Sequence, residues 1–276
     1  LQWNIAGPNN SPNVLSELTW SQIKIAQLNL YSSFVFNRKF YFRGNLDYGW
    51  IFDGKNQDSD YDSDNRQDEY SRSNNDANSG NVYDSNIAVG YMFRLFDPNV
   101  NQSLYLIPTV GYSVHVQELV MQNGMQTISE GPNTSPVGPI PGLNNSYDAK
   151  WYGPWVGADL SLEVAEKSDL LIRFEYHLVE YYAEANWNLR DEFQHPKSFE
   201  HVADGQGWLF SANFRRIISS NWVVGLSFDY QDWYTDAGID RIFLSDGRVG
   251  ELQLNRVDWT SLNFMVTVGY FTGDLF

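Results

Sequence analysis

Apolar and polar residues alternate with a period of two along most of this chain. Leu262, Phe264 and Val266 alternate with Asn263 and Thr267, for example. The same pattern covers 40–50, 83–93, 104–116, 156–164, 170–178, 208–214, 222–230 and 261–270, with a longer, less regular segment at 14–36 and a short one at 1–6. Successive side chains of a strand point to opposite faces, so the pattern predicts an all-β chain of about ten strands.

The two faces of these strands have the opposite composition from those of a soluble sandwich. One face is continuously apolar and aromatic, while the other carries mostly Gly, Ser, Asn and Asp. The polar face also holds charges of both signs, which could pair inside a lumen: Arg43, Asp47, Asp159, Glu163, Arg173, Glu175, Arg215 and Asp229. An apolar exterior around a polar interior is typical of a membrane barrel, because only closed barrels or helices satisfy every backbone group in lipid.

Connection lengths support the same fold. Tight links at 37–38, 96–99, 166–168 and 219–221 alternate with long polar segments at 52–81, 118–148, 183–205 and 233–256. Short periplasmic turns and long extracellular loops are the signature of outer-membrane barrels. A soluble all-β domain rarely carries four such loops. We therefore predict one closed antiparallel transmembrane β-barrel, spanning residues 1–276, in a bacterial outer membrane.

Composition excludes several other classes of protein. The chain holds 18 Lys and Arg against 34 Asp and Glu, a formal charge of −16, which is unsuited to nucleic acid. It has no Cys, so disulfides, thiolate chemistry and Cys-based zinc sites are excluded. No apolar run reaches the roughly 18–20 residues of a spanning helix. Four His residues make a metal-hydrolase cluster a poor hypothesis.

The segment 52–81 is the most acidic part of the chain, with 8 acidic and 3 basic residues. Asp58, Asp60, Asp62 and Asp64 stand at alternate positions and can point to one side of an extended segment. Close carboxylates raise one another's pKa or recruit a cation, so a Ca²⁺ or Mg²⁺ site is one hypothesis and a solvated acidic loop is the other. An EF-hand is excluded because Ser63 stands where its turn glycine belongs.

The region from residue 15 to residue 93 resembles the omptin family of outer-membrane proteases. The resemblance rests on Ser-Glu-Leu-Thr-Trp at 16–20, Tyr-Gly-Trp at 48–50, Gly-Lys-Asn-Gln-Asp-Ser-Asp-Tyr at 54–61 and Asp-Glu-Tyr-Ser-Arg at 68–72. It implies a ten-stranded barrel with an active site in the extracellular mouth, where an aspartate pair and an Asp-His pair activate a water. Asp58 and Asp60 match the aspartate pair.

The Asp-His half of that pattern is not matched. An ungapped count along the seventh strand places Asn186 and Asn188 at its two positions, and an amide cannot accept a proton from water. A shifted alignment uses Asp191 but puts a Phe where the His belongs; His195 or His201 in the same loop could then substitute. We expect Asp58 and Asp60 to face segment 183–205, with no His ring within water-bridging reach.

Several other polar and aromatic residues have simpler interpretations. His115 and His177 fall on the polar face, where lumen hydrogen bonds are expected. The Pro- and Gly-rich stretch 131–142 is typical of an extracellular turn region. The aromatics Trp151, Tyr152, Trp155, Tyr181 and Tyr182 are expected in an interfacial girdle, with sugar stacking as the alternative.

Three functions are compatible with the sequence. The first is a non-proteolytic, omptin-like barrel that acts as a surface, binding or assembly component, surrounded by lipopolysaccharide, with another envelope or surface protein as a potential partner. The second is an active omptin-like endopeptidase that uses Asp58 and Asp60 with a rearranged Asp191 and His195. The third is a narrow, cation-favouring porin, since about ten strands enclose a narrow lumen.

Overall fold

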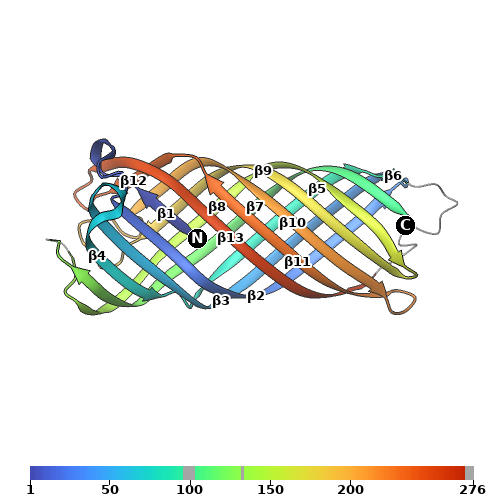
Figure 1. Ribbon diagram of the computed structural model, residues 1–276, viewed down its shortest axis with the longest axis horizontal. Helices are drawn as coiled ribbons and strands as arrows, with labels where there is room; N and C mark the ends of the chain where they lie inside the picture. The colour runs from blue at the N-terminus through green and yellow to red at the C-terminus, as the bar shows by residue number, and fades with distance from the viewer. Residues whose placement is uncertain (96–102, 132–133, 271–276) are drawn as a thin grey trace.

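The computed structural model describes residues 1–95, 103–131 and 134–270 as a tilted ring of antiparallel strands around a long axis (Figure 1). The strands are β1 (Gln2–Ile5), β2 (Ser16–Phe36), β3 (Phe40–Ser63), β4 (Gln67–Asp76), β5 (Gly80–Tyr91), β6 (Phe93–Arg94), β7 (Leu104–Ser129), β8 (Gly138–Ala165), β9 (Ser168–Asn186), β10 (Phe199–Ile217), β11 (Trp222–Thr235), β12 (Gly238–Phe243) and β13 (Val249–Tyr270). Short 3₁₀ turns occupy Pro8–Asn10 and Asp64–Arg66. Neither these turns nor any other described segment forms a helix long and apolar enough to cross a membrane.

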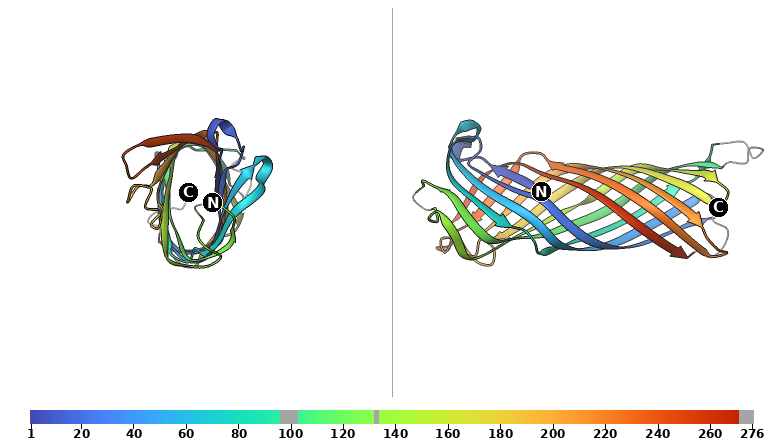
Figure 2. Two further views of the ribbon diagram at one scale, coloured as in Figure 1. Left: turned by 90° about the vertical axis from the view of Figure 1, so that its left-hand side faces the viewer. Right: turned by 60° about the horizontal axis from the view of Figure 1, so that its bottom comes forward.

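The strands make ten positions around the ring. Its order is β1-β2-β3-β4-β7-β8-β9-β10-β11-β13, and β13 pairs with β1 again. β5 shares the position of β4 between β3 and β7, and β12 shares that of β11 between β10 and β13. All of these pairs are antiparallel, and an end-on view looks along the ring's interior (Figure 2). The prediction of an all-β antiparallel barrel of about ten strands is confirmed.

The outward face carries a belt of exposed apolar side chains. Val266 is 80% exposed and Phe264 76%, as expected of lipid-facing residues. On β3 the belt runs from Phe40 to Phe52, a length that fits the apolar band of roughly 25 Å on such barrels. Residues of β3 beyond Phe52 therefore lie outside the belt, at the end we assign as extracellular.

The four long segments that the sequence analysis treats as loops need a correction. Most of 52–81, 118–148 and 233–256, and both ends of 183–205, continue as paired strand beyond the belt; Glu118, for example, pairs in register with Asp148. The outward face needs no apolar residues once a strand leaves the membrane. The apolar alternation therefore stops there while the backbone ladder continues. The connections at this end shorten to stretches such as 187–198 and 244–248.

Part of the predicted aromatic girdle is wrong. Trp151, Trp155 and Tyr181 are buried inside the ring, whereas Tyr152 and Tyr182 lie on its outer face. The alternation itself explains the difference, because Val156 on the lipid face forces odd-numbered neighbours on β8 inward. Trp151 and Tyr181 belong to the largest buried cluster, which also includes Trp3, Trp20, Tyr147 and Trp233.

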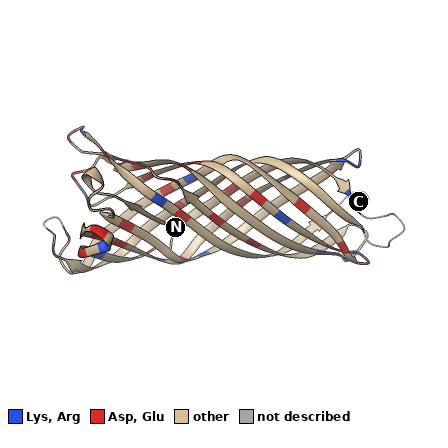
Figure 3. Cartoon of the chain, turned by 45° about the horizontal axis from the view of Figure 1, so that its top comes forward, with Lys and Arg blue, Asp and Glu red and all other residues tan. Residues whose placement is uncertain are grey.

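Mixed charges and histidines occupy the lumen as the sequence predicts. Arg43 forms ion pairs with Asp159 and Glu175. His115 Nδ1 lies 2.8 Å from an Asp84 carboxylate oxygen, and His177 Nε2 lies 3.0 Å from Glu175 Oε2. Charged residues are visible along the middle of the strands as well as at their ends (Figure 3).

Candidate binding site at the extracellular mouth

A change of facing on β3 brings Asp58 and Asp60 to the inner wall. Ile51 and Asn56 are both buried and inward, although one has an odd and the other an even residue number. The β2–β3 register shifts on both sides of Lys24, with one extra residue on each strand. Such bulges re-aim side chains, and this one turns the even-numbered residues beyond Phe52 inward.

Two serines hold the Asp60 carboxylate. Ser16 on β2 and Ser71 on β4 stand in register on either side of Asp60, and both hydroxyls donate hydrogen bonds to it. Asp58 lies in register between Leu18 and Ser73. Asp60 is therefore oriented by neighbouring strands, while Asp58 has the apolar Leu18 on one side.

Burial and mutual repulsion set the protonation of this pair. Burial raises the pKa of Asp58 well above its usual value, and the charge of Asp60 raises it further. Burial also raises the pKa of Asp60, although its serine hydrogen bonds oppose that shift. Beside them, burial and the charges of Asp60 and Asp62 raise the pKa of Tyr70 to about 12. The pair therefore favours a proton or a bound cation.

A cation does approach from the connection between β9 and β10. Arg190 in that connection lowers the pKa of both Asp58 and Asp60 by its charge. Arg190 Nε also donates to Glu192 Oε1 at 2.5 Å. The guanidinium thus compensates the aspartate pair while keeping a second carboxylate partner.

The inner face of β9 near the mouth does not carry the amide side chains that the sequence analysis expects there. Ala183 and Ala185 are buried on the inner face, and Trp187 follows them inward. Asn186 and Asn188 have the opposite parity and point outward, where Asn188 Nδ2 donates to the Gly142 carbonyl at 2.8 Å. The amide side chains of Asn186 and Asn188 therefore do not line the inner wall of the mouth.

The rearranged pair of Asp191 and His195 does not come together. His195 Nδ1 lies 2.8 Å from Asn186 Oδ1, and both Asp191 and His195 are exposed in the β9–β10 connection. Neither histidine of segment 183–205 has an Asp58 or Asp60 contact within the described ranges. His201 is turned away into the lumen instead.

His201 forms an Asp-His pair that sequence reasoning missed. Its Nδ1 lies 2.8 Å from the Tyr147 hydroxyl, and its Nε2 lies 3.3 Å from Asp240 Oδ1 on β12. Tyr147 in turn shares a 2.6 Å hydrogen bond with Tyr181. His201 is fully buried against Trp3, so no bulk water reaches it. No local signal identifies Asp240, because only the β10–β12 register places it beside His201.

The four alternate aspartates do not form one metal site. Asp62 and Asp64 lie at the exposed tip of the β3–β4 hairpin, where Asp64 Oδ1 accepts a hydrogen bond from the Asn13 backbone. Across the residues that the structure describes, no group of three or more His, Asp or Glu side chains has an arrangement that could hold a metal ion. The converging set is limited to Asp58 and Asp60.

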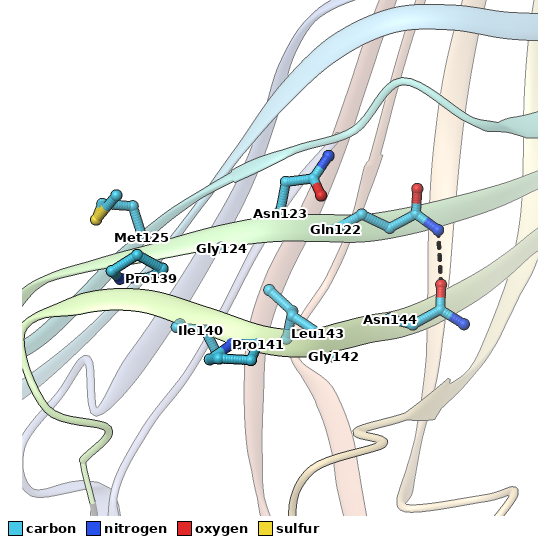
Figure 4. Close-up of a pocket in the computed structure, with 10 residues that line it drawn as sticks. All are labelled: Gln122, Asn123, Gly124, Met125, Pro139, Ile140, Pro141, Gly142, Leu143 and Asn144. Carbon is cyan, nitrogen blue, oxygen red and sulfur yellow. Dashed lines mark hydrogen bonds between the residues drawn. The ribbon is translucent and has the colours of Figure 1, made fainter.

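A separate groove opens where the β7–β8 register breaks between Gln122 and Gly124 (Figure 4). It encloses about 770 Å³ between Met125 and the Pro139–Pro141 stretch, and a hydrogen bond of 2.7 Å from Gln122 Nε2 to Asn144 closes one end. Its lining is apolar and amide-bearing, without a titratable group. Neither Asp58 nor Asp60 is among the residues that line this groove.

Comparison with known proteins supports the fold and the family. The crystal structure of the outer membrane protease OmpT from Escherichia coli is similar over 98% of this chain and 92% of that chain, with a TM-score of 0.76 and 13% sequence identity. No curated protein matches the chain. The sequence model described as "Pom: Protochlamydia outer membrane protein" matches residues 1–272. The chain is thus an outer-membrane β-barrel with an OmpT-like fold, and it belongs to the Pom family of outer membrane proteins.

Proposed function

We propose that this barrel binds cationic groups at its extracellular mouth and does not cleave them. The observation that carries the proposal is the buried pair of Asp58 and Asp60, whose opposing charge from segment 183–205 is Arg190, while the inner face of β9 at this end carries Ala183 and Ala185 instead of a general base. An acid pair without a base attracts positive charge but cannot complete the Asp-His chemistry that the omptin resemblance implies.

Two aspartates alone can activate water only when their carboxylates meet and share a proton, as in aspartic proteases. Asp58 and Asp60 are two residues apart on one strand, so their Cα atoms are roughly 7 Å apart. The Asp60 carboxylate is also turned toward Ser16 and Ser71 by hydrogen bonds. This arrangement favours two separate charge sites over one catalytic dyad.

Arg190 offers a mechanism for exchange. Its positive charge acts electrostatically on Asp58 and Asp60, and its guanidinium donates a hydrogen bond to Glu192. An incoming ammonium or guanidinium group can take its place at the aspartates, while the Glu192 contact retains the displaced side chain. Charge compensation is then preserved throughout binding, which avoids the penalty of leaving a buried carboxylate without a partner.

The porin alternative finds less support in the geometry. Trp151, Tyr181 and Trp233 fill the lumen below the mouth and are each at most 1% exposed. Side chains this deeply buried leave no water-sized space beside them. We therefore propose binding at the mouth, with passage through the resting barrel blocked.

Binding of a fluorescein-labelled oligolysine peptide to barrel refolded in lipopolysaccharide tests the proposal. We expect saturable binding that an oligoglutamine peptide of equal length does not show. Asp58→Asn with Asp60→Asn should weaken it about tenfold or more, the contribution of a charge-assisted hydrogen bond. Asp62→Asn with Asp64→Asn at the exposed tip is the matched control and should change it little. Equal losses in the two double variants, or equal binding of both peptides, would contradict the proposal.

A further inference from the structure

Two cationic side chains adjoin on the outer surface of the barrel at the end opposite the mouth, where Lys and Arg residues are visible in Figure 3. Lys167 lies in the tight turn between β8 and β9, and Arg216 lies close to the end of β10; both are exposed. Arg216 pairs in register with Ser168, the first residue of β9, and the Ile217 amide donates a hydrogen bond to the Lys167 carbonyl at 2.8 Å. Because neighbouring strands lie roughly 4.8 Å apart, Lys167, Ser168 and Arg216 are neighbours, and we call them the Arg216 patch.

The Arg216 patch lies at the edge of the apolar belt. Phe214 and Ile218 have the same parity as Arg216 and are 40% and 60% exposed on the outer face. Leu170 pairs in register with Phe214, so Ser168 shares that face two residues farther along β9. An arginine on the lipid face is tolerated near the membrane interface and is costly at the midplane, so Arg216 belongs at the depth of the lipid headgroups.

Ser168 has a hydroxyl without a partner in the chain. The residue is 4% exposed, and across the described ranges no group shares a hydrogen bond with its Oγ atom. Buried hydroxyls are ordinarily hydrogen-bonded, because an unpaired one lowers the stability of the fold. A free hydroxyl beside two cations is suited to an oxygen atom of an anionic ligand.

The acidic residues nearby leave the two cations of the patch without ion pairs. Asp169 forms its ion pair with Arg215, at 2.5 Å, on the inner face of the same two strands. Glu166 is exposed in the same turn as Lys167, but within the described part of the chain it forms no ion pair with Lys167 or Arg216. The outer surface therefore presents two positive charges that a ligand can contact.

The depth of the patch decides which anion it meets. Phospholipid phosphates lie at the membrane interface, and Lys and Arg side chains at that level attract anionic headgroups. Trp222, at the start of β11, is 48% exposed at the same end, and its carbonyl accepts a hydrogen bond from the Ile218 amide at 3.0 Å. Indole rings also favour this interface. Two cations, a hydroxyl and an aromatic ring at one depth fit a lipid headgroup better than a soluble acidic protein, which would contact only the turns beyond.

We propose that the Arg216 patch binds the phosphate of an anionic phospholipid in the periplasmic leaflet of the membrane. Lys167 and Arg216 supply the charge, and Ser168 Oγ donates a hydrogen bond to a phosphate oxygen. The patch lies at the opposite end of the barrel from Asp58 and Asp60, so this inference goes beyond the proposed binding function and does not depend on it.

Quenching of Trp222 fluorescence by brominated lipids tests the proposal. The barrel is refolded in vesicles that mix phosphatidylcholine with phosphatidylglycerol, with bromine on the acyl chains of one lipid at a time. The signal that Trp222→Phe lacks is assigned to Trp222. We expect phosphatidylglycerol to be preferred over phosphatidylcholine near Trp222 by about fivefold or more, the contribution of one surface Lys or Arg.

Variants of the patch separate its charge from its hydroxyl. Lys167→Gln with Arg216→Gln should remove most of the preference, whereas Arg216→Lys keeps the charge and should retain most of it. Ser168→Ala should lower the preference in part, because both cations remain. Full preference in Lys167→Gln with Arg216→Gln would overturn the proposal.

Arg38→Gln with Lys39→Gln is the matched control. These two exposed cations lie in the β2–β3 turn at the same end of the barrel, away from β9 and β10 in the strand order. Their loss should leave the preference near Trp222 unchanged. An equal loss in this control, or removal of the preference by added inorganic phosphate or by an oligoglutamate peptide, would show a diffuse charge effect or a soluble anion and would contradict the proposal.

Discussion

For Asp58 and Asp60, the face of the strand on which a residue lies matters as much as its identity. Their alternate spacing identifies them in the sequence, but the bulges beside Lys24 decide that they face the lumen. Successive residues of a strand point to opposite faces, and Asn186 is one position from the inward Ala185. This is why the amide side chains expected at the mouth are not on its inner wall. The alternate spacing is visible in the sequence, whereas the direction in which these side chains point depends on strand irregularities that leave no signal in the composition.

The raised pKa of Asp58 predicts a pH dependence of stability. A carboxyl whose pKa is higher in the folded state than in the unfolded chain favours folding while it is protonated. That contribution is complete below about pH 4 and is lost as the pH rises through the folded-state pKa. Asp58→Asn should therefore match the wild type at pH 4 and be the more stable of the two at pH 7. Urea unfolding of the refolded barrel measures both, and we expect a gain above about 1 kcal/mol, because a tenfold change in proton affinity is worth about 1.4 kcal/mol.

Asp53→Asn on the same strand is the control for that measurement. Asp53 is exposed and forms an ion pair with Lys24 at 2.5 Å, so removing its charge should bring no gain at pH 7. A gain that is equal at pH 4 and pH 7 for Asp58→Asn would show that its carboxyl is ionised as freely in the folded barrel as in the unfolded chain.

Packing in the lumen makes a further prediction for one glycine. A Cβ at Gly207 would lie 2.3 Å from the Trp233 ring, whereas nothing lies within 4 Å of one at Gly250. Gly207→Ala should destabilise the barrel by about 1–3 kcal/mol through overpacking. Gly250→Ala should change the free energy of unfolding by less, and equal values for the two variants would mean that Trp233 can move aside freely.

At the scale of the strand, alternation predicts facing well inside the apolar belt and poorly beyond it. β13 keeps its predicted lipid face from Leu262 to Val268, because only lipid demands apolar residues at every second position. Beyond the belt both faces of a strand can be polar, so the hairpins above the membrane resemble loops in the sequence although their backbones remain paired.

The lipid face of β13 can be tested directly. Val266→Arg places a charge near the middle of the belt and should cost about 2–4 kcal/mol. The adjacent Thr267 has the opposite parity and faces the lumen, so Thr267→Arg should cost clearly less. Urea titrations of refolding give both values, and the reverse order would mean that the facing of β13 is assigned incorrectly.

Amide hydrogen exchange tests the strands beyond the membrane. Leu119 and Met121 pair with Tyr147 and Asn145 on β8, so their amides should exchange as slowly as those of belt strands. The exposed connection around Asp191 should exchange quickly. Fast exchange throughout 118–148 would restore the loop interpretation of that segment.

At the scale of the whole molecule, alternation and connection lengths predicted the antiparallel ring. They could not predict what fills it, because the contacts that cross the lumen join residues far apart in sequence, such as Arg43 and Glu175. Pairs of this kind depend on strand tilt and register, which a single sequence does not encode locally. The OmpT-like fold was therefore predictable, whereas the buried contact between His201 and Asp240 was not.

Peptide cleavage is the measurement that tests the central claim most directly. Barrel refolded in lipopolysaccharide is incubated with fluorogenic basic peptides, beside an Asp60→Asn variant as the control. We predict that the wild type releases no more fluorophore than Asp60→Asn, because the only buried histidine near the mouth, His201 among the described residues, is enclosed with Tyr147 and Asp240. Cleavage by the wild type that Asp60→Asn abolishes would contradict the account and establish a protease.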